Sequence, residues 1–272
     1  MAEDERNHKI IQNIPNTKAK MSYNDINRHS RDGEIHFEAE SHTYSFRGET
    51  FISVTNIVEK CFETFDTELW AGRIAAKTHQ SVEEVKKQWQ EKSIMARKLG
   101  TQMHEKIERY YLGLPNEDDA TYALFRQFTQ AYHLVPYRSE WAIYDEQSKV
   151  AGTLDFLHYA DGEYIIFDWK RSNKLVLNGQ AVKQNRFGRM ALDPIPHIPD
   201  TTFWHYALQV SIYRHILEKN YAISTAAGKL GVFHPADGQY HVLDVPYLRD
   251  EAVTVLNHHK NLADGIVKPT TE

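Results

Sequence analysis

The stretch that decides the fold is AGTLDFLHYADGEYIIFDWKRS, residues 151–172. Two runs rich in β-branched and aromatic residues flank Asp161-Gly162, a dipeptide that strongly indicates a two-residue type I′ hairpin turn. With that turn, the paired residue numbers place Asp155 directly across from Asp168. Because side chains alternate along a strand, Lys170 is expected on the same face as these two carboxylates.

Directly opposed carboxylates are costly, since their Cβ atoms lie roughly 5 Å apart and like charges repel. In a partly buried position they need a proton, a cation or a divalent metal. A hard cation such as Mg²⁺ or Mn²⁺ suits oxygen ligands. The alternative is a pair at a sheet edge that Lys170 and solvent satisfy. The apolar neighbours are expected on the other face of the hairpin: Leu154, Phe156, Ile165, Phe167 and Trp169.

Signals on both sides of the hairpin predict an α/β fold with a mixed central β-sheet flanked by helices. Short β runs occupy residues 35–54. Asp66 and Asn116 are expected to cap helices, and Ser81 with Glu84 forms a capping box for a helix that reaches about Tyr111. Further helices are expected over residues 201–219 and from about 247.

Composition divides the chain into three regions. Residues 1–33 are polar and aperiodic and indicate a mobile arm, residues 34–95 an N-terminal β/helical accessory region, and residues 96–265 the core. Within that core, residues 171–200 show no convincing periodicity, and loops of this length are usually functional or disordered.

Several classes of protein are excluded by the composition of these 272 residues. The single cysteine, Cys61, rules out a disulfide framework and an iron–sulfur cluster held by four thiolates of one chain. No apolar run approaches a membrane span, and the first thirty residues lack a signal peptide. We therefore expect an intracellular protein in the cytoplasm or another reducing compartment, neither secreted nor membrane-bound. The net charge of −5 means that any contact with nucleic acid must use a local patch.

The order of motifs along the chain resembles the PD-(D/E)XK nuclease superfamily, in its RecB-like exonuclease branch. Asp155 followed by Asp168-Trp169-Lys170 looks like the catalytic hairpin of that superfamily. GTQMH, residues 100–104, resembles the GTxxH helix of this branch, and QVSIY, residues 209–213, resembles its QxxxY motif. The chain is similar to viral, phage and mitochondrial genome-maintenance exonucleases without iron–sulfur cysteines. The proline that usually precedes the first aspartate is absent.

The resemblance implies a restriction-endonuclease-like core and a site that holds one or two Mg²⁺ or Mn²⁺ ions. The implied metal ligands are His104, Asp155, Asp168 and the backbone carbonyl of Trp169, with Glu108 as a further candidate. Lys170 is implied to orient the attacking water or to stabilise charge in the transition state. Gln209 and Tyr213 are implied to contact DNA or brace the site. His205, on the same stripe, is better explained as a polar helix edge, and the indication that Glu140 supports the metal ligands is thin.

A basic segment follows the catalytic lysine directly. Between residues 170 and 192 there are six basic residues and no acidic one, and Phe187 among them could stack on a base. The predicted DNA-binding residues here are Arg171, Lys174, Lys183, Arg186, Phe187 and Arg189.

The expected function is that of a divalent-metal-dependent DNA exonuclease acting on single-stranded or end-exposed DNA, with a helicase or another replication or repair protein as a candidate partner. The alternatives are a structure-selective endonuclease and a non-catalytic DNA-binding subunit.

Overall fold

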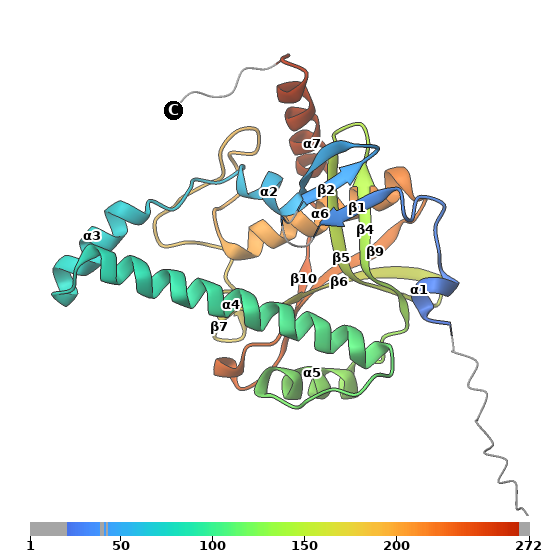
Figure 1. Cartoon of the computed structure of the whole chain (residues 1–272), viewed down its shortest axis with the longest axis horizontal. Coiled ribbons are helices and arrows are strands. Elements are labelled where there is room, and N and C mark those ends of the chain that lie inside the picture. Colours follow the sequence, from blue (N-terminus) through green and yellow to red (C-terminus); the bar gives the residue numbers. More distant parts are fainter. Residues whose placement is uncertain (1–20, 39–40, 42, 267–272) are drawn as a thin grey trace, which may run out of the picture.

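A computed structural model describes residues 21–38, 41 and 43–266 (Figure 1). Its centre is an eight-stranded mixed sheet in the order β1-β2-β3-β5-β6-β9-β10, with β4 paired to β5. Pairs β3–β5 and β6–β9 are parallel, and the others are antiparallel. The strands are β1 (Ile35–Glu38), β2 (Thr43–Phe46), β3 (Glu49–Ser53), β4 (Pro136–Asp145), β5 (Val150–Ala160), β6 (Glu163–Lys170), β9 (Thr225–Val232) and β10 (His241–Val245).

Helices cover both faces of the sheet, which confirms the predicted α/β class. One apolar cluster packs α2, α6 and α7 on the sheet, and another packs α4 and α5 on the opposite side. In Figure 1, α3 and the first half of α4 extend away from the sheet as an arm. The helices are α1 (Tyr23–Ile26), α2 (Val54–Glu59), α3 (Thr67–Thr78), α4 (Val82–Tyr111), α5 (Ala120–Ala131), α6 (Thr202–Asn220) and α7 (Arg249–Ala263), with a 3₁₀ turn over Pro235–Asp237. Of the described helices, none is long and apolar enough to cross a membrane.

The predicted helix caps are confirmed in two of three cases. Asp66 accepts the amide of Leu69, and Ser81 and Glu84 form the capping box of α4. The prediction for α5 is wrong, because Asp119 and not Asn116 is its N-cap. Both residue types cap helices well, and here Asn116 donates to the Lys106 carbonyl instead.

The predicted hairpin is confirmed. Ala160 pairs with Glu163, and Asp161 and Gly162 have positive φ angles of 54° and 83°, as a type I′ turn requires. The ladder keeps the expected register as far as the pair Phe156–Phe167.

Beyond that pair, β5 changes its partner. Because β4 occupies one edge of β5, β6 and β3 share the other edge, at residues 156–160 and 150–151 respectively. Residues 152–155 lie between these two partners. One expectation is wrong here: Leu154 packs in the cluster under α6, whereas Phe156 packs under α4 and α5. The strand changes direction at Asp155, so strict alternation fails there.

Residues 21–33 differ from the mobile arm that their composition indicates. They contain α1, and their polar side chains bind β4 through hydrogen bonds from Asn24 and Asn27. Residues 1–20 lie outside the described part of the chain. The expected boundary between residues 95 and 96 falls inside α4.

Residues 171–200 are irregular, as predicted, apart from the short pair β7 (Val176–Leu177) and β8 (Gln180–Ala181). They are nevertheless anchored. Leu175, Ile195 and Ile198 are buried in the cluster under α6. The amide of Leu192 donates to the carbonyl of Cys61 at 2.8 Å, which ties the segment to the end of α2.

Candidate metal centre

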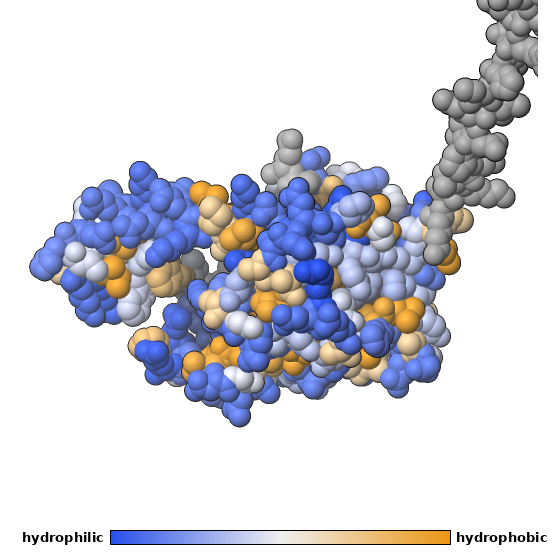
Figure 2. Space-filling view, turned by 90° about the horizontal axis from the view of Figure 1, so that it is seen from below, coloured by the Kyte–Doolittle hydropathy of each residue, from blue (hydrophilic) through white to orange (hydrophobic). Residues whose placement is uncertain are grey.

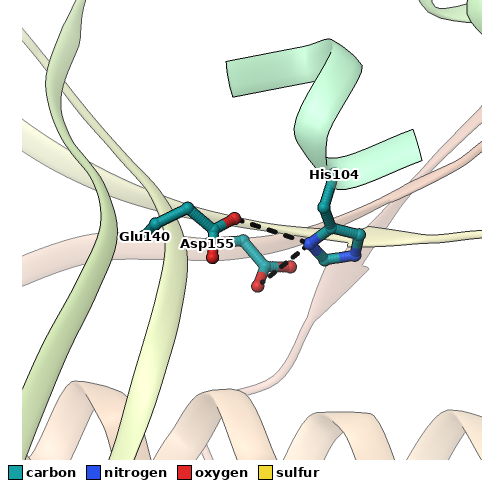
Figure 3. Close-up of side chains that lie close together, drawn as sticks. All are labelled: His104, Glu140 and Asp155. Atoms are coloured by element: carbon teal, nitrogen blue, oxygen red, sulfur yellow. Dashed lines mark ion pairs between the residues drawn. The ribbon is translucent and has the colours of Figure 1, made fainter. Parts of the chain in front are cut away.

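Three side chains from three elements converge beside the bend in β5 (Figure 3). His104 comes from α4, Glu140 from β4 and Asp155 from β5. The Nδ1 atom of His104 lies 3.6 Å from Oε1 of Glu140 and 3.6 Å from Oδ1 of Asp155. One potential ligand atom from each residue falls within 4.8 Å of the others. In the described part of the chain, this is the one such group of histidine, cysteine and acidic side chains.

The backbone of β6 orients His104. Its Nε2 atom lies 3.0 Å from the carbonyl oxygen of Trp169, and because a carbonyl can only accept, Nε2 must carry hydrogen. Burial opposes protonation of His104, but the carboxylates of Asp155 and Glu140 outweigh it and raise its pKa to about 9. The Nε2–H bond would hold the neutral ring in the tautomer that can ligate a metal through Nδ1.

Asp155 divides its two oxygens between the backbone and the histidine. Its Oδ2 atom accepts the amide of Trp169 at 2.7 Å, in place of a backbone carbonyl at the point where β5 leaves β6. Its Oδ1 atom faces His104. Burial raises the pKa of Asp155, while the positive charges of His104 and Lys170 oppose that rise.

Asp168 and Lys170 form a buried ion pair beside this group. The Lys170 Nζ atom lies 2.7 Å from Oδ2 of Asp168, and the two side chains are 14% and 1% exposed. Burial raises the pKa of Asp168 to about 6, and the ammonium of Lys170 limits the rise. Burial alone lowers the pKa of Lys170, but the neighbouring carboxylates outweigh it and raise that pKa. Lysine and aspartate therefore hold each other charged in a nearly dry position.

The residues present fit a divalent cation. Ligand atoms about 2.1 Å from an octahedral ion lie about 3.0 Å apart when adjacent and about 4.2 Å apart when opposite. The 3.6 Å separations at His104 fall between these values. With His104 neutral, the carboxylates of Glu140, Asp155 and Asp168 outnumber the one nearby ammonium by two charges. One Mg²⁺ or Mn²⁺ cancels that excess, and the nitrogen ligand favours Mn²⁺.

The structure brings together most of the residues that the sequence assigns to the site. His104, Asp155, Asp168 and Lys170 interact with one another electrostatically. The carbonyl of Trp169 is used to orient the histidine. Glu108 lies outside the three-residue group, and burial followed by repulsion from Glu105 raises its pKa.

Glu140 is the site residue that sequence reasoning underrated. It has a positive φ angle of 45°, and the pairing of β4 with β5 passes from Ser139–Phe156 to Trp141–Leu154 around it. Its carboxylate points toward the ring of His104 (Figure 3). The available signal was an acidic residue between Ser139 and Trp141 in a strand otherwise poor in acidic side chains.

Helix α6 closes the site on the side of Asp168. Gln209 donates to Tyr213 Oη at 3.2 Å and lies 3.5 Å from Oδ1 of Asp168, which agrees with a bracing position. Tyr213 packs against Gly152, where a Cβ atom would lie only 2.7 Å from the ring. His205 pairs with Asp200 at 2.9 Å and stacks on a phenylalanine, which supports its interpretation as a polar helix edge.

The basic segment is divided between structural and exposed side chains. Arg171 bonds the hydroxyl of Thr121, and Arg189 pairs with Asp200. Arg189 is exposed despite this ion pair, as are Lys174, Lys183, Arg186 and Phe187. Phe187 is 71% exposed, and its ring lies 6.3 Å from that of Trp70 at the start of α3.

Comparisons with known proteins leave the function to be judged from this geometry. No protein-family model matches the chain, and no curated protein matches it. Among solved structures, the crystal structure of SSO0001 is similar over 84% of this chain and 81% of that chain, with 14% identity and a TM-score of 0.36. A likeness at this level identifies neither a family nor an activity.

Proposed function

We propose that this chain is a divalent-metal-dependent DNA nuclease with a PD-(D/E)XK-type core, acting as an exonuclease on single-stranded or end-exposed DNA. The observation that carries the proposal is the juxtaposition of His104, Glu140 and Asp155 with the buried pair of Asp168 and Lys170. A nitrogen and several oxygen ligands beside a fixed ammonium can support hydrolysis of a phosphodiester, because a bound metal and a preorganised positive charge both stabilise the transition state.

A bound Mg²⁺ or Mn²⁺ supplies polarisation of the phosphate and a lower pKa for an attacking water. The residues of this chain do the remaining work. Asp155, Glu140 and His104 would hold the ion, with His104 oriented by the Trp169 carbonyl. Asp168 holds the ammonium of Lys170 beside these ligands, where it would stabilise negative charge that develops on the phosphate. Because Lys170 acts mainly in the transition state, its removal should reduce cleavage more than DNA binding.

The preference for a DNA end is supported by the way residues 171–200 are tied down. Phe187 lies against Trp70 of α3, and Leu192 is bonded to Cys61 at the end of α2. Figure 2 shows a hollow between the lobe formed by α3 with the first half of α4 and the rest of the molecule. We interpret the segment held by these two contacts as one side of an arch over the site, which would admit a threaded single strand more readily than a duplex.

Metal binding is tested first, by thermal unfolding with and without Mn²⁺. At a free concentration of 100 times Kd, binding adds about 2.7 kcal/mol to the free energy of unfolding. For a chain of this size that corresponds to a Tm increase of about 5–11 °C. Asp155→Asn should abolish the increase. Asp244→Asn, which changes an exposed carboxylate with 84% side-chain exposure, should retain it.

Nuclease activity is tested on matched linear and circular single-stranded DNA in Mn²⁺. The proposal expects digestion of the linear strand, slow attack on the circle, and loss of both in Asp155→Asn but not in Asp244→Asn. Equal rates on the two substrates would favour the endonuclease alternative. Metal binding with DNA binding but no cleavage would identify a non-catalytic DNA-binding subunit.

A further inference from the structure

One edge of strand β4 has no described partner strand at the candidate metal centre. It pairs only with β5 among the described strands, and Glu140 sits on it with a left-handed backbone, φ 45°. That conformation is unfavourable for a residue other than glycine, so surrounding contacts must hold it. The Glu140 side chain is 35% exposed, and its carboxylate faces His104.

Residues 22–32, which we call the N-terminal clamp, occupy this open edge beside β4. Asn24 accepts the amide of Ser139 at 2.9 Å and donates to the carbonyl of Ser139 at 3.3 Å. Its amide group thus supplies the acceptor and the donor that a neighbouring strand would provide. The hydroxyl of Tyr23 bonds the Ser139 hydroxyl at 2.8 Å.

The clamp also holds the residue on the other side of Glu140. Asp32 accepts the indole N–H of Trp141 at 2.8 Å and pairs with Arg138 at 2.7 Å. The residues that flank Glu140 are therefore bonded directly to the clamp.

The clamp is held by ring contacts as well as by hydrogen bonds: the His29 ring lies 4.8 Å from the Tyr221 ring, and the Arg31 guanidinium lies 4.0 Å from the Tyr144 ring. Helix α1 has four residues, none of them buried, and a helix this short is not stable in isolation. Its order therefore depends on the contacts that the clamp makes with β4 and with Tyr221 at the end of α6. At the residues that flank Glu140, however, the clamp makes hydrogen bonds, and directional bonds of this kind suit a positioning role.

We propose that the N-terminal clamp positions Glu140 for metal binding, with Asn24 and Tyr23 as positioning residues that act through the backbone of Ser139. The inference rests on the proposed metal site. Loss of the clamp should let the β4 backbone relax at residue 140 and turn the carboxylate away from His104. Changes of this kind around metal ligands typically weaken affinity by 10- to 100-fold.

Mn²⁺ affinity, measured by isothermal titration of the full chain, tests the proposal. Asn24→Ala should raise the Kd roughly tenfold, at the lower end of that range, and Tyr23→Phe should raise it by a smaller factor. Asn220→Ala is the matched control, because Asn220 also bonds β4, at Tyr144 and Asp145, but far along the strand. It should bind Mn²⁺ as the wild type does. Circular dichroism at the titration temperature establishes that each variant is folded, and Tyr23→Phe serves if Asn24→Ala does not fold.

A double-mutant cycle separates positioning from general damage. If Asn24 acts through Glu140, Asn24→Ala should weaken binding no further once Glu140→Gln is present. Independent losses that multiply, an unchanged Kd in the Asn24 and Tyr23 variants, or an equal loss in Asn220→Ala would each overturn the inference.

The outcome for the wild type distinguishes this inference from the proposed function. A wild type that binds Mn²⁺ without cleaving DNA refutes the nuclease, while the titrations still decide the role of the clamp. A wild type that cleaves DNA while Asn24→Ala and Tyr23→Phe keep its Kd refutes the clamp alone. A wild type that binds no Mn²⁺ refutes both.

Discussion

Replacing Lys170 by methionine should destabilise the metal-free protein strongly above neutral pH and much less in acid. The Lys170 ammonium lies 2.7 Å from an Asp168 carboxylate that is 1% exposed. Methionine keeps an unbranched apolar side chain but removes the charge. Removing one partner of a buried ion pair costs about 3–5 kcal/mol, a large fraction of the 5–15 kcal/mol typical of the free energy of unfolding.

The pH dependence follows from the proton on Asp168. Burial raises the pKa of this carboxyl to about 6 with Lys170 in place, and loss of the ammonium raises it further. A carboxyl with a higher pKa in the folded state binds more protons when folded, so stability falls as the pH rises toward that pKa. The wild type stops losing stability from this group near pH 6, while the variant continues to lose it. The difference in the free energy of unfolding between the wild type and Lys170→Met should therefore increase above about pH 6.

Urea unfolding in EDTA at pH 5 and pH 8, followed by far-ultraviolet circular dichroism, measures this difference. The double variant Asp168→Asn/Lys170→Met should recover all but about 1 kcal/mol at pH 8, because no buried charge remains unpaired. Lys229→Met, which breaks an exposed pair with Asp244, should change stability by under about 1 kcal/mol at both pH values. Equal deficits for Lys170→Met at the two pH values, or no recovery in the double variant, would refute the reasoning.

Three further outcomes are expected. Gly152→Ala should lower the free energy of unfolding by about 1–3 kcal/mol in thermal denaturation, because its Cβ atom would lie 2.7 Å from the Tyr213 ring; a variant as stable as the wild type contradicts that close approach. Cys61 is 4% exposed, and burial raises the pKa of its thiol to about 12. It should therefore react with a thiol reagent only after unfolding in guanidinium, and rapid labelling of the native protein would contradict this expectation. Burial opposes ionisation of Asp145, but hydrogen bonds from Ser148 and Asn220 outweigh it and lower the pKa of this carboxyl. The stability lost in Asp145→Asn should therefore be full at pH 7 and vanish as the pH falls below about 4. A constant loss from pH 7 to pH 3 would exclude this linkage.

Features that depend on neighbouring residues were predictable from the sequence. Asp161-Gly162 fixes both the turn and the register of the hairpin, because its backbone angles permit one two-residue connection. Ser81 and Glu84 satisfy each other across one helical turn, so the start of α4 is encoded in four residues. The β5–β6 ladder ends one pair before the predicted Asp155–Asp168 pair, but the two carboxyl groups still lie close enough to interact electrostatically.

Features that depend on distant residues were not predictable. Glu140 gains its role from a backbone angle that its own side chain disfavours. Asn24 is bonded to a strand 115 residues away, and its surroundings are polar enough to indicate a mobile arm. Leu154 shows the limit of period-two alternation, which holds only while a strand keeps the same partners. Each of these features comes from tertiary contacts that leave no local periodicity.

The separation between the clamp and its strand has a consequence for synthesis of the chain. Tyr23 and its partner Ser139 are 116 residues apart. At 5–20 residues per second, the ribosome needs about 6–23 s to travel that distance. Throughout this interval the four residues of α1 lack the contacts that order them. Assembly of the His104, Glu140 and Asp155 group is therefore a late, long-range event, because the N-terminal segment emerges well before the strand that it holds.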